Sequence, residues 1–206
     1  MSQNKDIPTS STLLELCRQD KSGASDSWNR LLSLYRKLIF YWILEFGIAP
    51  TDRDDVYQDV CFTLAKELKK FKRRGPRTFR GWLRHIVHSR CMDFHNRYKK
   101  NKMSRLTDGG AKIPDKYDSA AVDSFLDDNA IPAEQKRKED SILRNSLKAL
   151  LKQKFQDVHV EAFMLYMKNT LNAREIGDKL GLEHDNVRQI VCRVKKYLKD
   201  NFEDVL

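Results

Sequence analysis

The sequence predicts an all-α protein of two small helical domains joined by an acidic, flexible linker. Three observations support this prediction. The 206 residues include only eight glycines and five prolines, and few of these interrupt a periodic run, which favours helices over a turn-rich β fold. Apolar residues recur at spacings of three and four, as on the buried face of a helix. Residues 106–134 lose this periodicity and carry a net charge of −5, which is typical of a tether.

The composition also indicates where in the cell the protein is found. The four cysteines are far apart and form no Cys-x-x-Cys pair, as is usual for free intracellular thiols. The N-terminus lacks an apolar signal core, and no window approaches the roughly 18 apolar residues of a membrane span. We therefore expect a cytoplasmic protein with no membrane partner.

The N-terminal half predicts a series of helices. Residues 1–11 are polar and predict a disordered tail. A short helix follows, and then a long apolar helix that begins near Asp26 and stops near Gly47. Thr51 or Asp52 then caps a third helix, whose first turn is rich in acidic residues.

This third helix has two contrasting faces. Its apolar arc predicts core positions: Val56, Tyr57, Val60, Cys61, Leu64, Leu68 and Phe71. The opposite arc carries Asp55, Gln58, Asp59 and Phe62. An exposed phenylalanine beside carboxylates is unusual on the solvated face of a basic chain, which favours a binding surface. The alternative is a shallowly packed phenylalanine among ordinary surface acids.

Positive charge is concentrated in one segment. Residues 66–105 hold fifteen Lys or Arg against two acidic residues, a net charge of +13, whereas the whole chain carries +10. A polyanion is the natural partner of such a segment. Within it, Thr78 caps a helix with an inner stripe of Phe79, Leu83, Ile86, Val87 and Phe94. Trp82 lies at the edge of this stripe, and Arg80, Arg84 and His88 face away from it.

The same helix carries His88, Cys91 and His95 on a common face, which resembles a set of metal ligands. A zinc site on one helix normally needs a further ligand from elsewhere, and the sequence has no second Cys/His cluster. We expect neither a metal ion nor another cofactor.

The C-terminal part predicts a helix-turn-helix. A helix from Glu134 to Leu151 and a second through Met167 precede a short helix, a turn at Gly181 and a last helix from about His184 to Lys199. The outward face of that last helix is basic. The alternative is an ordinary amphipathic hairpin with a solvated lysine face.

Both halves together resemble a bacterial RNA polymerase sigma factor of the small extracytoplasmic-function (ECF) group. The N-terminal resemblance rests on Asp52-x-Asp54-Asp55-Val56-x-Gln58-Asp59-Val60, on Phe79-Arg80-Gly81-Trp82-Leu83-Arg84-x-Ile86-Val87 and on Asp93. The C-terminal resemblance rests on Glu175-Ile176-Gly177-x-x-Leu180-Gly181-Leu182, Asn186-Val187-Arg188 and Arg193-Val194-x-x-x-Leu198. It implies that residues 12–102 form sigma region 2, residues 103–133 a linker and residues 134–206 sigma region 4.

The resemblance also implies partners and sites. Core RNA polymerase would be bound at its clamp by Asp55, Gln58, Asp59 and Phe62, and at its flap by region 4. The promoter −10 element would be melted and bound by Lys72, Arg73, Arg74, Arg77, Arg80, Trp82, Arg84 and His88. The −35 element would be bound by Asn186, Arg188, Gln189, Arg193, Lys195, Lys196 and Lys199. An anti-sigma protein is a further candidate partner.

Two departures from the family pattern matter. The family often has Asn where Ser89 stands and more Arg at Phe94-His95-Asn96, so a −10 base preference does not carry over. Gly177 replaces a commoner Ala, a change expected to cost its helix at most about 1 kcal/mol.

Two other classes of function fit the sequence less well. A conventional helix-turn-helix regulator would leave the Phe62 face and the +13 segment without a purpose. An enzyme would need a nucleophile–base pair, paired carboxylates at a basic pocket or a phosphate-binding glycine loop, and the sequence offers none of them. We therefore expect a non-enzymatic promoter-specificity subunit.

Overall fold

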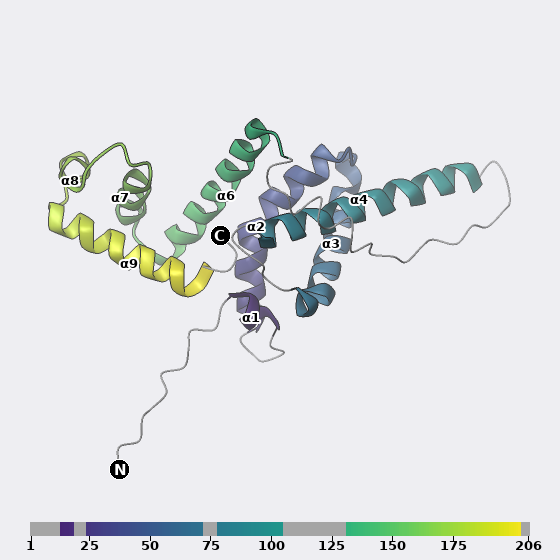
Figure 1. Cartoon of the computed structure of the whole chain (residues 1–206), viewed down its shortest axis with the longest axis horizontal. Helices are drawn as coiled ribbons and strands as arrows, with labels where there is room; N and C mark the ends of the chain where they lie inside the picture. Colours follow the sequence, from purple (N-terminus) through teal and green to yellow (C-terminus); the bar gives the residue numbers. More distant parts are fainter. Residues whose placement is uncertain (1–12, 19–23, 72–77, 105–130, 203–206) are drawn as a thin grey trace, which may run out of the picture. The chain divides into compact units, whose positions relative to one another are not determined.

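The described residues fold entirely into helices, turns and short connections. The computed structural model describes residues 13–18, 24–71, 78–104 and 131–202, and none of these lies in a β-strand. The helices, labelled in Figure 1, are α1 (Leu13–Arg18), α2 (Ala24–Glu45), α3 (Arg53–Glu67), α4 (Thr78–Ser104), α6 (Ala133–Lys154), α7 (Asp157–Met167), α8 (Ala173–Leu180) and α9 (His184–Phe202). Two 3₁₀ turns, η1 (Pro50–Asp52) and η2 (Leu68–Lys70), flank α3. The all-α prediction is confirmed.

The chain separates into two compact units. One comprises described residues up to Leu34 together with those from Leu143 onward, and the other comprises Tyr35–Ile142. Helices α2 and α6 each cross this division, so each unit draws on both predicted domains. The predicted boundaries at residues 102 and 134 remain a prediction. Most of the predicted linker and the whole predicted tail lie outside the described residues.

Helix α2 ends as its sequence predicts, at a glycine in a left-handed conformation. Gly47 has φ +78°, and the amide of Phe46 donates to the carbonyl of Trp42. The amide of Ile48 donates to the carbonyl of Ile43, which closes the last turn. Asp52 precedes α3, but its side chain makes no capping hydrogen bond, and the turn η1 leads the chain into the helix instead.

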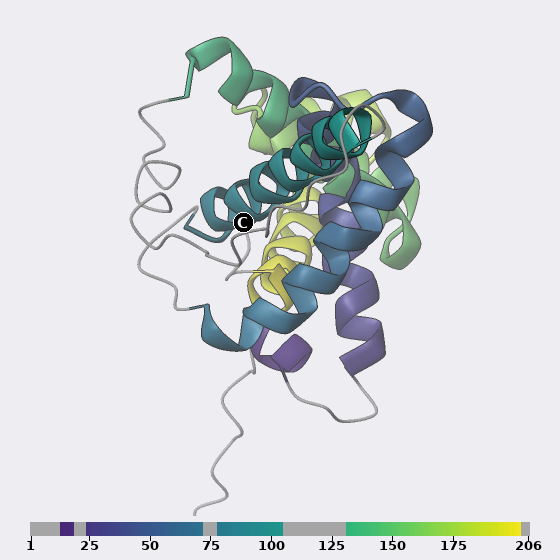
Figure 2. The same cartoon turned by 90° about the vertical axis from the view of Figure 1, so that its right-hand side faces the viewer.

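The core of the second unit lies between α2, α3 and α4, and α3 packs directly on α4 (Figure 2). The apolar stripe predicted on α3 is buried at Val56, Val60 and Leu64. On α4 the buried stripe holds Phe79, Leu83, Ile86 and Val87, as predicted. These side chains are almost fully removed from water, which makes their burial the main stabilising term of the unit.

The core of the first unit is a cluster of small and branched side chains on α6, α7, α8 and α9. Its fully or nearly fully buried members are Leu151, Val160, Ala162, Phe163, Ile176, Val187, Ile190, Val191 and Val194. On the last helix, Val187, Ile190, Val191 and Val194 therefore point inward, opposite to the basic face. None of the helices in the described ranges is long and apolar enough to cross a membrane.

A close backbone approach sets the turn between α8 and α9. The amide of Leu182 donates to the carbonyl of Gly177 at 2.9 Å, and a Cβ atom at position 177 would lie 2.4 Å from the Leu182 carbonyl oxygen. Gly181, with φ +67°, caps α8 in the left-handed conformation. The predicted helix-propensity cost of Gly177 stays a prediction, but the turn has no room for a methyl group at this position.

Candidate functional site

One long face of α3 remains uncovered, and it carries the predicted anchor residues. Asp55 and Gln58 are exposed, Asp59 is half-buried, and the Phe62 side chain is 75% exposed. Val56 and Val60 on the other side of the helix are 1% and 0% exposed. The two faces therefore separate as predicted, and the alternative of a packed Phe62 is wrong.

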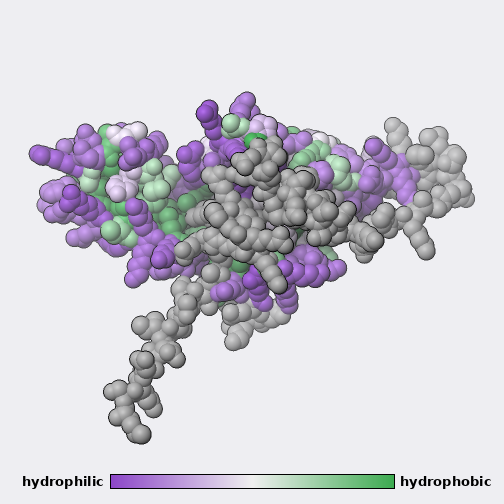
Figure 3. Space-filling view, in the orientation of Figure 1, coloured by the Kyte–Doolittle hydropathy of each residue, from purple (hydrophilic) through white to green (hydrophobic). Residues whose placement is uncertain are grey.

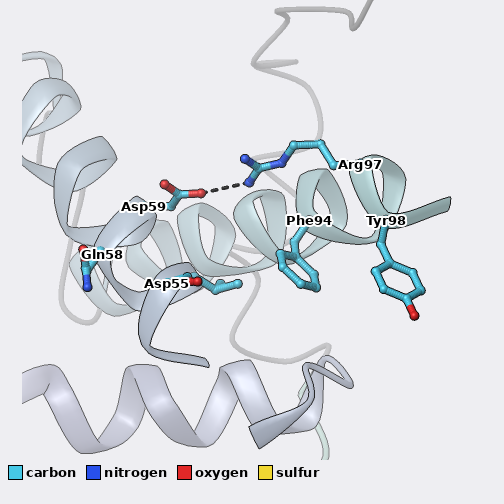
Figure 4. A pocket seen from close by; sticks show the side chains of 7 residues that line it. Asp55, Gln58, Asp59, Phe94, Arg97 and Tyr98 are labelled. Atoms are coloured by element: carbon cyan, nitrogen blue, oxygen red, sulfur yellow. Dashed lines mark hydrogen bonds and ion pairs between the residues drawn. The ribbon is translucent and has the colours of Figure 1, made fainter. Parts of the chain in front are cut away.

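Beside this face, α3 and α4 enclose an open cleft of about 430 Å³. Helix α3 contributes Asp55, Gln58 and Asp59 to it, and α4 contributes Phe94, Arg97 and Tyr98 (Figure 4). Arg97 Nη2 lies 2.9 Å from Asp59 Oδ2, and about half of each of the two side chains is exposed. The inner-stripe prediction for Phe94 is therefore only partly met, since its half-buried ring lines this cleft.

The cleft and the α3 face together offer a definite chemistry. Two carboxylates can accept hydrogen bonds from a basic partner, an amide can accept or donate them, and the aromatic rings supply apolar contact area. The Asp59–Arg97 ion pair fixes one carboxylate without burying it, so it contributes little to stability. A basic helical segment with apolar side chains matches this surface.

The predicted −10 residues on α4 fall into different environments. Trp82 is half-buried, and its ring packs 4.7 Å from that of Phe71 and 5.7 Å from that of Phe79. Arg84 and His88 are also half-buried. The remaining members, Lys72, Arg73, Arg74 and Arg77, lie outside the described residues.

Arg80 departs from its prediction. It was expected to face away from the core, but its residue is only 7% exposed. Its guanidinium Nη1 donates to Asp140 Oδ1 at 2.6 Å, and Glu139 lies on the same side. The expectation of a solvated arginine is wrong because α6, from 60 residues further along the chain, covers it.

The histidines of α4 sit against the end of α2. His95 Nε2 lies 2.9 Å from the Phe46 carbonyl oxygen, and the His88 ring meets the Phe46 ring edge-on. Burial lowers the pKa of both His85 and His88, and for His88 the nearby charge of Arg84 lowers it further. Cys91 is fully buried, which raises its pKa to about 12. In the part of the chain that the structure describes, no three metal-binding side chains cluster.

The outward face of α9 carries the predicted −35 residues. Arg188, Gln189, Arg193, Lys195, Lys196 and Lys199 are all exposed, and Asn186 is half-buried. Hydrophilic residues accordingly predominate along the α9 surface in Figure 3. Two of these cations have local contacts: Arg188 Nη1 lies 3.8 Å from Asp185 Oδ1, and Lys195 Nζ lies 4.7 Å from the centre of the Tyr166 ring. The basic face is therefore available to an anion.

The comparison with protein families decides how the second unit is interpreted. Residues 31–101 match the model for sigma-70 region 2. These residues, about a third of the chain, are therefore similar to sigma-70 region 2. The matched residues include the α3 face, the cleft and α4 as far as Asn101. No match was found among curated proteins or solved structures.

This similarity favours, as a proposal, a sigma factor of the sigma-70 family with a role in polymerase binding and promoter recognition. The match does not extend to α6–α9, so their role stays a prediction. The individual contacts assigned to the site residues also stay predictions.

Two groups of residues were missed. Phe94, Arg97 and Tyr98 join the α3 face because α4 runs beside α3, and their three- and four-residue spacing on α4 was a usable signal. Glu139 is fully buried against Trp42 and was not singled out at all. Nothing local distinguishes it, because it follows directly from a run of charged residues.

Proposed function

We propose that this chain is a promoter-specificity subunit of the extracytoplasmic-function group. It binds core RNA polymerase, recognises the −35 and −10 elements and helps to melt the −10 element. The observation that carries the proposal is the region 2 match, which coincides with an uncovered acidic and aromatic face on α3.

The α3 face is the proposed anchor on the polymerase clamp. Asp55 and Asp59 steer a basic partner, Gln58 adds a neutral hydrogen bond, and Phe62 is buried in the complex. The Phe62 side chain is 75% exposed, so it adds little hydrophobic stabilisation to the free protein. Its exposure therefore favours a role in binding a partner that covers it.

DNA contacts divide between the two halves of the chain. The basic residues 72–77 and the start of α4 follow the melted strand, on which Trp82 stacks or wedges. The α9 face is inserted in the major groove of the −35 element, where Arg188, Gln189 and Arg193 reach base edges. Lys195, Lys196 and Lys199 attract the phosphates.

One experiment separates this proposal from its alternatives. Core RNA polymerase is supplied with the protein and a promoter library, and transcripts and DNA cleavage products are measured in the same tubes. We expect transcripts from a defined promoter subset and no cleavage. Binding without transcripts would instead indicate a helix-turn-helix regulator, and cleavage would indicate a nuclease.

A further inference from the structure

The first turns of α6 are held against region 2 by two adjacent carboxylates. Trp42 Nε1 on α2 donates to Glu139 Oε1 at 2.8 Å. Arg80 Nη1 on α4 donates to Asp140 Oδ1 at 2.6 Å, and Arg80 Nε lies 4.0 Å from Glu139 Oε2. All four residues belong to the same compact unit, Tyr35–Ile142. These contacts join segments 60 and 97 residues apart in the chain.

Burial of the Glu139 carboxylate is not the arrangement expected if the contact only stabilised the fold. Glu139 and Trp42 are each 0% exposed. Glu139 Oε2 makes no hydrogen bond within the described residues, and Arg80 is too distant to supply one. Burying a carboxylate with half of its acceptor capacity unmet is unfavourable, and an apolar residue at position 139 would pack at lower cost. The carboxylate is better explained by a contact that must release.

The group that these carboxylates hold is an arginine proposed to contact promoter DNA. A guanidinium binds a carboxylate and a phosphate with the same planar set of donors, so the two acceptors compete for it. In this conformation Asp140 occupies one of these donors, and the Arg80 residue is 7% exposed. Nucleic acid cannot reach Arg80 unless α6 moves away.

We propose that Glu139 and Asp140 form an acidic latch that withholds Arg80 from DNA in the free chain. The latch rests on the proposed function, because it assumes that Arg80 contacts the promoter strand. Binding to polymerase or DNA favours the open state, and an open latch in turn favours DNA by the same factor. The apparent affinity of the free chain for DNA is reduced by the fraction of molecules that are closed.

The test uses the full-length chain and a labelled single-stranded oligonucleotide. The latch variant is Glu139→Gln with Asp140→Asn. The matched control is Glu134→Gln with Glu161→Gln, which changes the net charge equally at two exposed positions. Asp140→Asn alone is a milder variant, since this carboxylate is partly exposed and the Trp42 contact stays intact. Opening of the Glu139–Trp42 contact is measured separately, as the rate of hydrogen exchange at the Trp42 indole N–H. The chain has three tryptophans, so the Trp42 signal is assigned by its loss in Trp42→Phe.

We expect the latch variant to speed Trp42 indole exchange and to bind the oligonucleotide about fivefold or more tightly. Asp140→Asn alone should tighten binding in the same direction, and the control pair should change neither measurement by as much. Adding Arg80→Gln to the latch variant should abolish the gain, because the gain comes from the released arginine.

Three results would overturn the latch. The first is an equal gain in the control pair, which would assign the effect to net charge. The second is a gain that survives Arg80→Gln. The third is faster Trp42 exchange with unchanged DNA affinity. Transcription with core polymerase is scored on the wild-type chain, so failure of the proposed sigma role appears there and remains separate from failure of the latch.

Discussion

Gly177 shows how a single residue can set a turn. A methyl group at this position would meet the Leu182 carbonyl oxygen at 2.4 Å, and both atoms belong to the tightly bonded turn between α8 and α9. We expect Gly177→Ala to lower the free energy of unfolding of this part of the chain by about 1–3 kcal/mol, although alanine is the better helix former. Urea unfolding followed by circular dichroism measures the effect. Lys179→Ala, at an exposed position on the same helix, should change it by less than about 0.5 kcal/mol.

Phe62 is the residue whose exposure most needs a partner. We expect Phe62→Ala to leave thermal melting of the free protein unchanged, since its side chain is 75% exposed. Loss of a buried aromatic anchor should cost the polymerase complex about 2 kcal/mol, which is roughly a 30-fold faster dissociation. Surface plasmon resonance on immobilised core polymerase measures the lifetime.

Val60→Ala, two residues away on the buried side of α3, should give the opposite result. Val60 is fully buried, so its truncation should lower the free energy of unfolding by about 2 kcal/mol. If Phe62→Ala melts and dissociates like the wild type, the clamp anchor lies elsewhere on the molecule.

Among the elements, α8 depends on a capping box that encloses its first turn. The Asn172 side chain accepts hydrogen bonds from the amides of Arg174 and Glu175, both at 3.0 Å. Glu175 Oε2 in turn accepts from the Asn172 amide at 2.7 Å. We expect Asn172→Ala to lower the free energy of unfolding by about 1 kcal/mol and to weaken binding to −35 duplex DNA by the fraction that unfolds. Asn172→Asp, which keeps the acceptor, should retain most of the stability.

Helix α4 makes the fold sensitive to acid. Burial holds the pKa of His85 and His88 below 6.5, whereas both titrate near 6.5 in the unfolded chain. As the pH falls below about 6.5 the unfolded chain binds protons first, so the free energy of unfolding is fully present above that pH and declines below it. Urea unfolding at pH values of about 7.5 and 5.5 should show this decline.

This acid-induced decline in the free energy of unfolding should be smaller in the double variant His85→Gln/His88→Gln than in the wild type. His184→Gln, at an exposed position at the start of α9, serves as the control and should retain the full decline. An identical pH dependence in all three proteins would mean that other groups cause it.

The sequence was sufficient for the helices because their signals are local. Apolar spacing located α2, α3, α4 and α9, and it separated Phe62 from Val60 on α3. Arg80 and Glu139 could not be paired in this way, since their contact joins α4 to α6 across 59 residues of sequence. The capping box at Asn172 was not predicted, although Asn followed three residues later by Glu is a local pattern.

At the scale of the whole molecule, charge separation should govern binding to duplex DNA. The +13 segment and the basic α9 face lie in parts of the chain separated by the acidic stretch 106–134. We expect the free protein to bind duplex DNA weakly and with little specificity. With roughly six phosphate contacts, the slope of log affinity against log salt should be about −5. Fluorescence anisotropy over a salt titration measures the slope, and tight, salt-insensitive binding to a promoter would contradict the prediction.

The fixed turn at Gly177 also bears on how such a chain can diverge. The angle between α8 and α9 is set by a backbone hydrogen bond and by van der Waals exclusion, and no side chain on the outward face takes part. Arg188, Gln189 and Arg193 can therefore be exchanged without reorienting the helix that presents them. If the α9 face binds the −35 element as proposed, a few substitutions on that face would change the preferred promoter while the backbone stays constant. A panel of variants exchanged at these positions would then bind a range of promoter sequences.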